Sequence, residues 1–422
     1  MLTIQRVPTI VSINQTSSGD ANSSLPGATL PVYRYVKADA RQIFSGPEDV
    51  FGSNVNSTPC SPPEEKPTRL DEIIQHEWQE REKKNLFRYN VAESESKLLQ
   101  GPSGYIAQLN EGRHSKKRPT EFRVDEVLQP YDPKKFNFTK VDSEEILFAF
   151  EEKSDEVDSE SYLENGPTGE SPNLVVINVS PIEYGHILLV PKVKSQIPQR
   201  IDPENLVVAL HMAVEVNNPC FRLGYNSFGA FASINHLHFQ AYYLDAQFPI
   251  ERAETRKIFE SGKKGGYGIS EVVKYPVRTL VYEAGDSLKE LADVVGEACI
   301  RLQNSNIPFN ILISDCGTRV FLIPQCYAEK QARGEVEQEL LDTQVNPAVW
   351  EISGHIVLKR RKDYNTATEE FAEKFLAEVS LSESRFSEVK KMCKNVAERA
   401  EVESSLKEQP NYRGGLDLEI VL

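Results

Sequence analysis

The segment Ser233–Ala241 reads Ser-Ile-Asn-His-Leu-His-Phe-Gln-Ala and alternates polar with apolar side chains without interruption. A period of two predicts a β-strand, here over residues 234–244, because successive side chains of a strand point to opposite faces of a sheet. His236, His238 and Gln240 are therefore expected to share one face, while the apolar residues between them pack on a core. Two imidazoles and one amide would project together from this strand.

Three interpretations of the two histidines compete: half-exposed side chains of a solvent-facing sheet, two ligands of a metal ion, or a nucleophile with its companion. The first is disfavoured because two of only seven histidines stand at i and i+2 on an otherwise apolar strand. The second lacks an obvious third ligand nearby, so we expect no metal. We favour a nucleophilic histidine, which is competent at pH 7 when a hydrogen bond to its second nitrogen fixes the tautomer.

The overall charge limits which molecules can bind. The 422 residues include 48 Lys plus Arg and 63 Asp plus Glu, which gives a formal net charge of −15. Nucleic acids and anionic membranes would be repelled on average, so neither is an expected partner. The apolar content of 39% fits a globular protein rather than a collagen, a coiled coil or a membrane bundle. Six scattered cysteines and no apolar leader predict a cytoplasmic protein with reduced thiols.

Hydrophobic periodicity predicts a mixture of helices and strands. The expected elements are helix 70–87, strands 173–179 and 186–190, helix 203–215, strand 234–244, helix 287–302, a hairpin of 309–314 with 319–323, and a helical stretch over 369–401. Gly354–Leu358 is similar in sequence to Gly185–Leu189, which suggests that the second half of the chain repeats the first.

Composition divides the chain into four parts. Residues 1–68 are rich in Ser, Pro, Gly and Asn and are expected to form a mostly irregular arm. Residues 69–260 form a first half that contains the histidine segment and an acidic surface insertion at 151–171. Residues 261–403 form a second half without a histidine motif, and residues 404–422 form a loose tail.

The order His, apolar, His, apolar, Gln resembles the histidine-triad superfamily. The final Gln resembles its nucleotidyltransferase branch, which includes galactose-1-phosphate uridylyltransferase. Longer stretches narrow the resemblance to the plant GDP-L-galactose phosphorylase family, among them LFRYNV at 86–91, AQLNEGRHSKKRPTEFRVDEVLQP at 107–130, INVSPIEYGHILLVPKV at 177–193 and FRLGYNSFGAFASINHLHFQAYYL at 221–244.

This resemblance implies an α+β protein of two histidine-triad-like halves, each an antiparallel sheet with flanking helices, of which only the first keeps the nucleophile. It also implies conversion of GDP-L-galactose and phosphate to L-galactose 1-phosphate and GDP, a step of ascorbate synthesis, without a cofactor. By analogy, His238 attacks the α-phosphorus and carries the guanylyl group. His236 would orient the site, and Gln240 would donate an N–H to the developing negative charge.

Further residues are expected to bind substrate. Asn226, Gly229 and Ser233 precede the histidines and are placed to contact ribose and phosphates, and Lys192 follows a turn that resembles the superfamily. The densest basic cluster would clamp the β-phosphate or the incoming phosphate through Arg113, Lys116 and Arg118. The alternative for this cluster is a solvated basic turn paired with nearby carboxylates.

Two alternative functions are kept open. In the first, the chain is a GDP-D-glucose phosphorylase, which is the nearest enzymatic rival. In the second, it is a catalytically silent regulatory protein that binds GDP-sugars. The second half is expected to complete the nucleotide pocket or to form a homodimer. The run KKRP at 116–119 resembles a nuclear localisation signal, so a nuclear fraction is a secondary expectation beside the cytoplasm.

Overall fold

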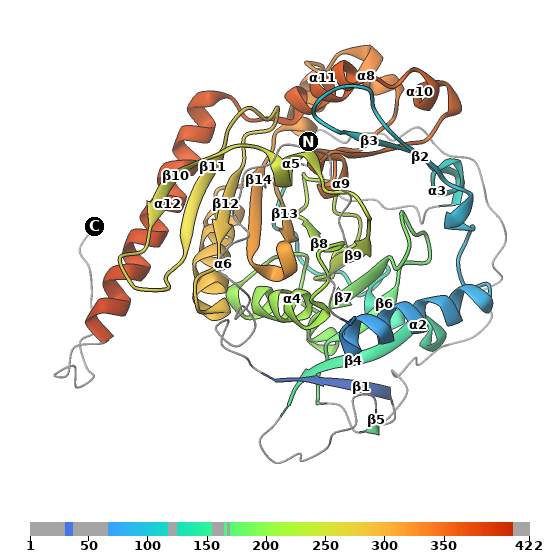
Figure 1. Ribbon diagram of the computed structural model, residues 1–422, viewed down its shortest axis with the longest axis horizontal. Helices are drawn as coiled ribbons and strands as arrows, with labels where there is room; N and C mark the ends of the chain where they lie inside the picture. Colours follow the sequence, from blue (N-terminus) through green and yellow to red (C-terminus); the bar gives the residue numbers. More distant parts are fainter. Residues whose placement is uncertain (1–29, 37–65, 117–124, 154–163, 167–168, 408–422) are drawn as a thin grey trace.

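The computed structural model describes residues 30–36, 66–116, 125–153, 164–166 and 169–407. Within these residues, one large β-sheet carries helices on both faces, and a small sheet lies beside it (Figure 1). The predicted α+β class is therefore confirmed. The predicted loose tail was wrong for residues 404–407, which are the end of a helix, and its remainder, like much of the predicted N-terminal arm, lies outside the described residues.

The large sheet contains twelve of the described strands, in the order β10-β11-β12-β14-β13-β8-β9-β7-β6-β4-β1-β5. Neighbouring strands are antiparallel, except that β1 runs parallel to β4. The strands are β1 Leu30–Tyr35, β4 Ile146–Glu152, β5 Glu164–Gly166, β6 Leu174–Ile177, β7 Ile187–Val190, β8 Phe221–Asn226, β9 Phe239–Tyr243, β10 Thr255–Glu260, β11 Gly268–Val272, β12 Leu280–Glu283, β13 Phe309–Ser314 and β14 Arg319–Pro324.

The predicted strands are confirmed, although one is shorter than predicted, and several strands of the structure were not predicted. The strand predicted over 234–244 is shorter and begins only at Phe239, so both histidines of the motif lie in the segment that leads into β9. Sequence analysis also did not predict β1 and β5, which lie within the expected arm and the acidic insertion and pair with each other. Because β1 also pairs with β4, the arm supplies a strand to the main sheet.

The large sheet contains two copies of a repeated unit, which meet at the centre of the sheet. The first half runs β6, β7, α4, β8, β9, and the second runs β11, β12, α6, β13, β14, with β8 and β13 paired antiparallel between them. The sequence similarity that suggested this repeat matched the wrong segments. Gly354–Leu358 leads into β15 (His355–Leu358), which belongs to the small sheet, whereas the counterpart of β7 in the repeat is β12.

The described helices are short apart from five that flank the sheet, and several begin with a side-chain cap. Asp202 and Ser287 each accept the backbone N–H three residues later, which satisfies a donor at the start of α4 and of α6. The helices are α2 Arg69–Lys83, α3 Glu111–Lys116, α4 Pro203–Val216, α5 Pro249–Arg252, α6 Leu288–Asn304, α7 Tyr327–Arg333, α8 Gln338–Asp342, α9 Val349–Ser353, α10 Arg361–Thr366, α11 Glu369–Val379 and α12 Glu383–Lys407. Helices α2, α4 and α6 match predictions, while the stretch predicted over 369–401 divides into α11 and α12.

The two faces of the sheet are covered differently. Helices α2, α4, α6 and α12 pack on one face and build the largest apolar core, which includes Leu237, Phe239 and Ala241. The other face is covered in two places. One cover contains α7, α9 and α11 with the small sheet of β15, β3 (Ile106–Leu109) and β2 (Glu95–Leu98), and the other contains the 3₁₀ turn η2, Phe138–Lys140.

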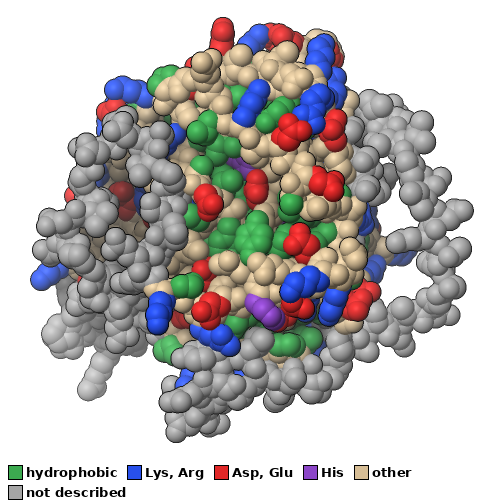
Figure 2. All heavy atoms as spheres, turned by 45° about the vertical axis from the view of Figure 1, so that its right-hand side comes forward, with side chains coloured by type: hydrophobic (Ala, Val, Ile, Leu, Met, Phe, Trp, Pro, Cys, Tyr) green, Lys and Arg blue, Asp and Glu red, His purple; other side chains and the backbone are tan. Residues whose placement is uncertain are grey.

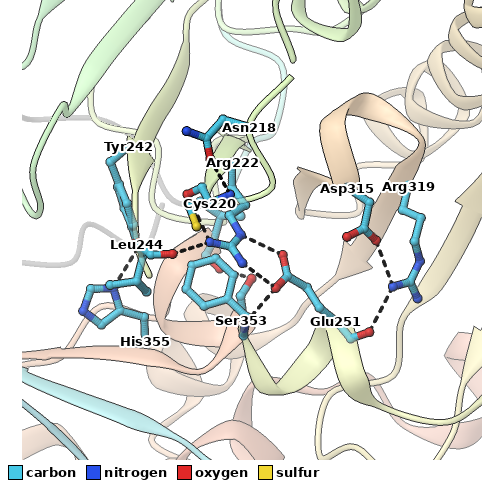
Figure 3. A network of polar contacts seen from close by, with 12 residues as sticks. Asn218, Cys220, Arg222, Tyr242, Leu244, Glu251, Asp315, Arg319, Ser353 and His355 are labelled. Carbon is cyan, nitrogen blue, oxygen red and sulfur yellow. Dashed lines mark hydrogen bonds and ion pairs between the residues drawn. The ribbon is translucent and has the colours of Figure 1, made fainter. Parts of the chain in front are cut away.

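A buried ion pair ties β8 to the connection between the halves. Arg222 donates from Nε and Nη2 to the two carboxylate oxygens of Glu251 in α5, at 3.0 and 3.1 Å. The Arg222 guanidinium also bonds the backbone carbonyls of Cys220 and Leu244 (Figure 3). Both side chains of the pair are at most 4% exposed, and burial raises the pKa of Glu251 while Arg222 opposes that rise.

The surface reflects the acidic composition. On the side of the molecule that carries α2 and α3, carboxylates lie among hydrophobic side chains across the middle, and most basic side chains lie toward the edges (Figure 2). Among the described residues, no helix is long and apolar enough to cross a membrane.

Candidate active site

The hydrogen bonds of His238 fix its tautomer. Its Nδ1 lies 2.8 Å from the backbone carbonyl oxygen of His236. A carbonyl only accepts, so Nδ1 carries the proton and Nε2 keeps its lone pair. This is the tautomer that a nucleophilic histidine requires at Nε2.

Burial also keeps His238 uncharged. The side chain is half-buried and packs against the ring of Phe138, with 5.1 Å between the ring centroids. Desolvation lowers the pKa of His238 to about 4, and the hydrogen bond to the His236 carbonyl opposes this shift. The imidazole is therefore neutral at physiological pH and available as a nucleophile.

His236 is enclosed rather than exposed. Its side chain has no accessible surface, and the backbone N–H of Phe138 donates to its Nδ1 over 3.1 Å. Tyr131 contacts the ring edge-on, and desolvation followed by the proximity of His238 lowers the pKa of His236 to about 4. His236 thus contacts His238 through its backbone carbonyl, while the His236 ring packs against the segment that ends in η2.

Gln240 lies on β9 between β7 and β8 and is partly exposed. Its side chain lies beside the ring of His186, the residue before β7. The Ile182 N–H donates to Nδ1 of that ring over 2.8 Å, and Asn178 Nδ2 lies 3.1 Å from its Nε2. His186 is fully buried, and desolvation lowers its pKa well below the usual value. Gln240 therefore lies beside a neutral imidazole.

Sequence analysis did not single out Glu183, an ionisable group in the turn that precedes His186. Glu183 accepts a hydrogen bond from Gln108 Nε2 of β3 at 2.7 Å, and the same Nε2 donates to the Ile182 carbonyl. Burial raises the pKa of Glu183 to about 7, although the bonds from Tyr184 and Gln108 oppose the rise. No local pattern marks this carboxylate, because its partner is 75 residues away in the chain.

Of the three residues predicted before the histidines, Asn226 lies at the junction of the halves. Asn226 ends β8, and its Oδ1 accepts from Asn310 Nδ2 at 2.6 Å and from the Val349 N–H at 3.0 Å. Gly229 has a φ of +74° in the following turn, a conformation that glycine adopts without strain. Ser233 lies three residues before His236, where it is partly exposed.

Lys192 follows β7, and its φ of +42° places it at the start of the 3₁₀ turn η4 (Val193–Ser195). The Lys192 ammonium pairs with Glu204 at 2.8 Å on the surface. The next residue, Val193, contacts the first histidine of the motif through its backbone. The turn therefore adjoins His236, while the Lys192 side chain bonds a carboxylate of α4.

The predicted basic cluster is described only in part. Arg113 lies in α3, donates from Nη1 to the backbone carbonyl of Ser180, and lowers the pKa of His186 through its charge. Its guanidinium is thus near the His186 ring, which lies beside Gln240. The side chain of Lys116 and all of Arg118 lie outside the described part of the chain. Among the described residues, no group of three or more His, Cys, Asp or Glu could hold a metal ion.

Comparison with known proteins assigns the family. The model described as "GDPGP1-like, N-terminal domain" matches residues 69–242, and that described as "GDPGP1-like, C-terminal domain" matches residues 249–400. The chain belongs to the GDPGP1-like family. The two matches together cover more than half of the chain and meet close to α5.

Curated relatives agree with this family. The chain is 51% identical to GDP-L-galactose phosphorylase 1 of Arabidopsis thaliana, over 99% of this chain and 95% of that protein. It is 54% identical to GDP-L-galactose phosphorylase 2 of the same plant, over 93% and 90%. Human GDP-D-glucose phosphorylase 1 is 31% identical over 76% of this chain and 82% of that protein.

A solved structure shares the fold. The crystal structure of yeast Ap4A phosphorylase Apa2 in complex with Ap4A superposes with a TM-score of 0.51 and 16% identity, over 74% of this chain and 98% of that chain. At this identity the likeness concerns the fold alone.

Proposed function

We propose that this chain is a GDP-L-galactose phosphorylase that acts through a guanylyl-histidine intermediate. The observation that carries the proposal is the hydrogen bond from His238 Nδ1 to the His236 carbonyl, which leaves a neutral Nε2 lone pair. The family membership and the plant relatives supply the substrate class.

The reaction proceeds in two displacements. Nε2 of His238 attacks the α-phosphorus of GDP-L-galactose, the bond from that phosphorus to the bridging oxygen breaks, and L-galactose 1-phosphate leaves with the electron pair. An oxygen of inorganic phosphate then attacks the same phosphorus, the P–N bond breaks, and GDP leaves as the His238 lone pair is restored. Covalent catalysis of this kind predicts ping-pong kinetics.

The neighbouring residues support both displacements. The His236 carbonyl accepts from Nδ1 throughout, so it stabilises the positive charge that develops on the His238 ring. Gln240 donates an amide N–H to the phosphoryl oxygens, and its side chain lies beside the neutral His186 ring. Because an amide does not titrate, Gln240 cannot take a proton from an attacking water, which favours transfer to phosphate.

Arg113 lies near His186 and supplies positive charge for a phosphate group in an otherwise acidic protein. Asn226, Gly229 and Ser233 form the turn that leads to the histidines and contact the ribose and phosphates in this proposal. Lys192 would have to exchange Glu204 for phosphate. Placement in the cytoplasm, with a nuclear fraction, and assembly as a homodimer remain predictions.

A side-by-side assay separates this function from its rivals. The purified protein is incubated with GDP-L-galactose or GDP-D-glucose, with and without inorganic phosphate, and the nucleotide products are separated. We expect GDP only when phosphate is present, and a higher kcat/KM for GDP-L-galactose. A preference for GDP-D-glucose would assign the rival activity, and binding without turnover of either sugar would assign a regulatory protein.

A further inference from the structure

The segment that contains His236 and His238 lacks the support of the sheet. Strand pairing of β9 begins at Phe239 opposite Leu189 on β7, and at Gln240 opposite Gly224 on β8. The backbone N–H and C=O of His238 therefore need partners from elsewhere, because unpaired buried backbone groups are costly.

The segment 197–199, which precedes α4, supplies these partners. The carbonyl of Ile197 accepts the Leu237 N–H at 2.8 Å. The Gln199 amide then bonds both sides of the next residue: Oε1 accepts the His238 N–H at 3.0 Å, and Nε2 donates to the His238 carbonyl at 3.3 Å. One side-chain amide thus takes the place of a neighbouring strand.

Gln199 is itself held firmly. Its side chain is buried, and its Nε2 also donates to the Asn226 carbonyl at 2.9 Å. Its backbone N–H donates to Asn235 Oδ1 at 2.9 Å, and its backbone carbonyl accepts from the Tyr225 hydroxyl at 3.1 Å. Bonds on every side leave this amide little freedom, so it transmits its position to the backbone of His238.

We propose that Gln199 is a positioning residue for the nucleophile, which sets the backbone of His238 so that its Nδ1–H meets the His236 carbonyl. The inference rests on the proposed function, because it assigns Gln199 a part in that reaction. Gln199 need not touch the substrate. A displacement of about 1 Å at a reacting group costs on the order of 100-fold in rate, so loss of the amide acts on the chemical step.

The chain offers a matched control in α6. Gln303 makes the same pair of bonds to the backbone of Ile201, with Oε1 accepting the N–H at 2.7 Å and Nε2 donating to the carbonyl at 3.1 Å. It is buried to a similar degree, 5% exposed against 2% for Gln199. Its bonds hold a residue only two positions from Gln199, yet they do not reach the histidines.

The test compares Gln199→Met with Gln303→Met, because methionine keeps the volume and removes the amide. We expect Gln199→Met to lower kcat for GDP-L-galactose about 10- to 100-fold with a KM within about threefold of wild type. We expect Gln303→Met to lose comparable thermal stability and to keep kcat within about threefold. A milder variant, Gln199→Asn, serves if Gln199→Met does not fold.

A spectroscopic measurement distinguishes positioning from general destabilisation. In protein labelled with ¹⁵N at its seven histidines, the His238 signal of wild type should report a proton on Nδ1. We expect Gln199→Met, but not Gln303→Met, to shift this signal toward a mixture of tautomers.

Wild-type kcat in a folded Gln199 variant, or equal loss of kcat in the Gln303 control, would overturn the inference. Absence of phosphate-dependent turnover in the wild-type protein would instead overturn the proposed function, so the two failures are distinct.

Discussion

The two histidines of the motif have opposite tautomers, which suits different tasks. His238 donates from Nδ1 to a carbonyl, whereas His236 accepts at Nδ1 from the Phe138 N–H and therefore carries its proton on Nε2. The first arrangement leaves a lone pair for attack. The second locks a buried ring in place, so that His236 contributes its backbone rather than its imidazole to the nucleophile.

The depressed pKa of His238 predicts the pH dependence of the first displacement. Because burial lowers this pKa to about 4, the imidazole stays neutral well below the usual titration range near 6.5. The single-turnover rate with GDP-L-galactose and no phosphate should therefore be constant from about pH 8 to about pH 5 and fall at lower pH as Nε2 is protonated. Rapid-quench measurements across this range test it. A fall centred near pH 6.5 would contradict it.

Sequence patterns singled out the histidines of the motif but not the residues that set their protonation state. His236, His238 and Gln240 stand out in the alternation, because a period of two is a local property, although the strand itself begins only at Phe239. Phe138 and Gln199 lie 98 and 39 residues from their histidine partners, and neither stands in a recognisable pattern. Such contacts depend on how distant segments pack, which one sequence does not reveal.

At the scale of elements, a glycine in the middle of β8 makes room for α9. Gly224 pairs with Gln240 of β9, and an added Cβ would lie 2.6 Å from Val349 Cγ1 and 3.1 Å from Trp350 Cη2. These contacts are too short for an ordinary Cβ. The close approach brings α9, from the second half, onto the strands that carry the site.

Gly224→Ala should therefore destabilise the fold. We expect a loss of about 1–3 kcal/mol in the free energy of unfolding, the usual cost of overpacking a core, measured by urea titration. Gly268→Ala is the matched control on β11, because its nearest added contact is 3.9 Å away. Its free energy of unfolding should change by less than about 1 kcal/mol. Equal losses in the two variants would show that the close approach does not matter.

The elements were predictable wherever their periodicity is strong. Helices α4 and α6 and the β13–β14 hairpin match the expected ranges closely, because each has an apolar face and clear end signals. The start of β9 was not predictable, since the alternation continues through residues that pair with 197–199 instead of a strand. The repeat was misplaced because its evidence was similarity over five residues, whereas the actual repeat is topological.

At the scale of the molecule, the two family domains are joined as one sheet through β8 and β13. Polar bonds reinforce this junction, including Asn226 with Asn310 and the Arg222–Glu251 pair beneath it. Only the first half carries the histidine motif. The second half contributes instead by supporting the strands and turns from which the motif extends.

Arg222→Met should destabilise the whole chain, because it leaves the Glu251 carboxylate buried without its partner. Removal of one member of a buried pair typically costs about 3–5 kcal/mol, measured as a lower free energy of unfolding in urea. Arg256→Met is the control, since Arg256 pairs with Glu271 but its side chain is 66% exposed. The control should lose less than about 1 kcal/mol. A loss at Arg222 no greater than in the control would contradict this account of the junction.

The central claim is that His238 carries the guanylyl group, and one labelling experiment tests it most directly. The protein is incubated with GDP-L-galactose labelled in its α-phosphate, without inorganic phosphate, then quenched under alkaline conditions and mapped by peptide mass. The account predicts label on His238, its release as GDP when phosphate is added to the unquenched protein, and none retained by folded His238→Ala. Label on another residue, or full turnover by His238→Ala, would contradict it.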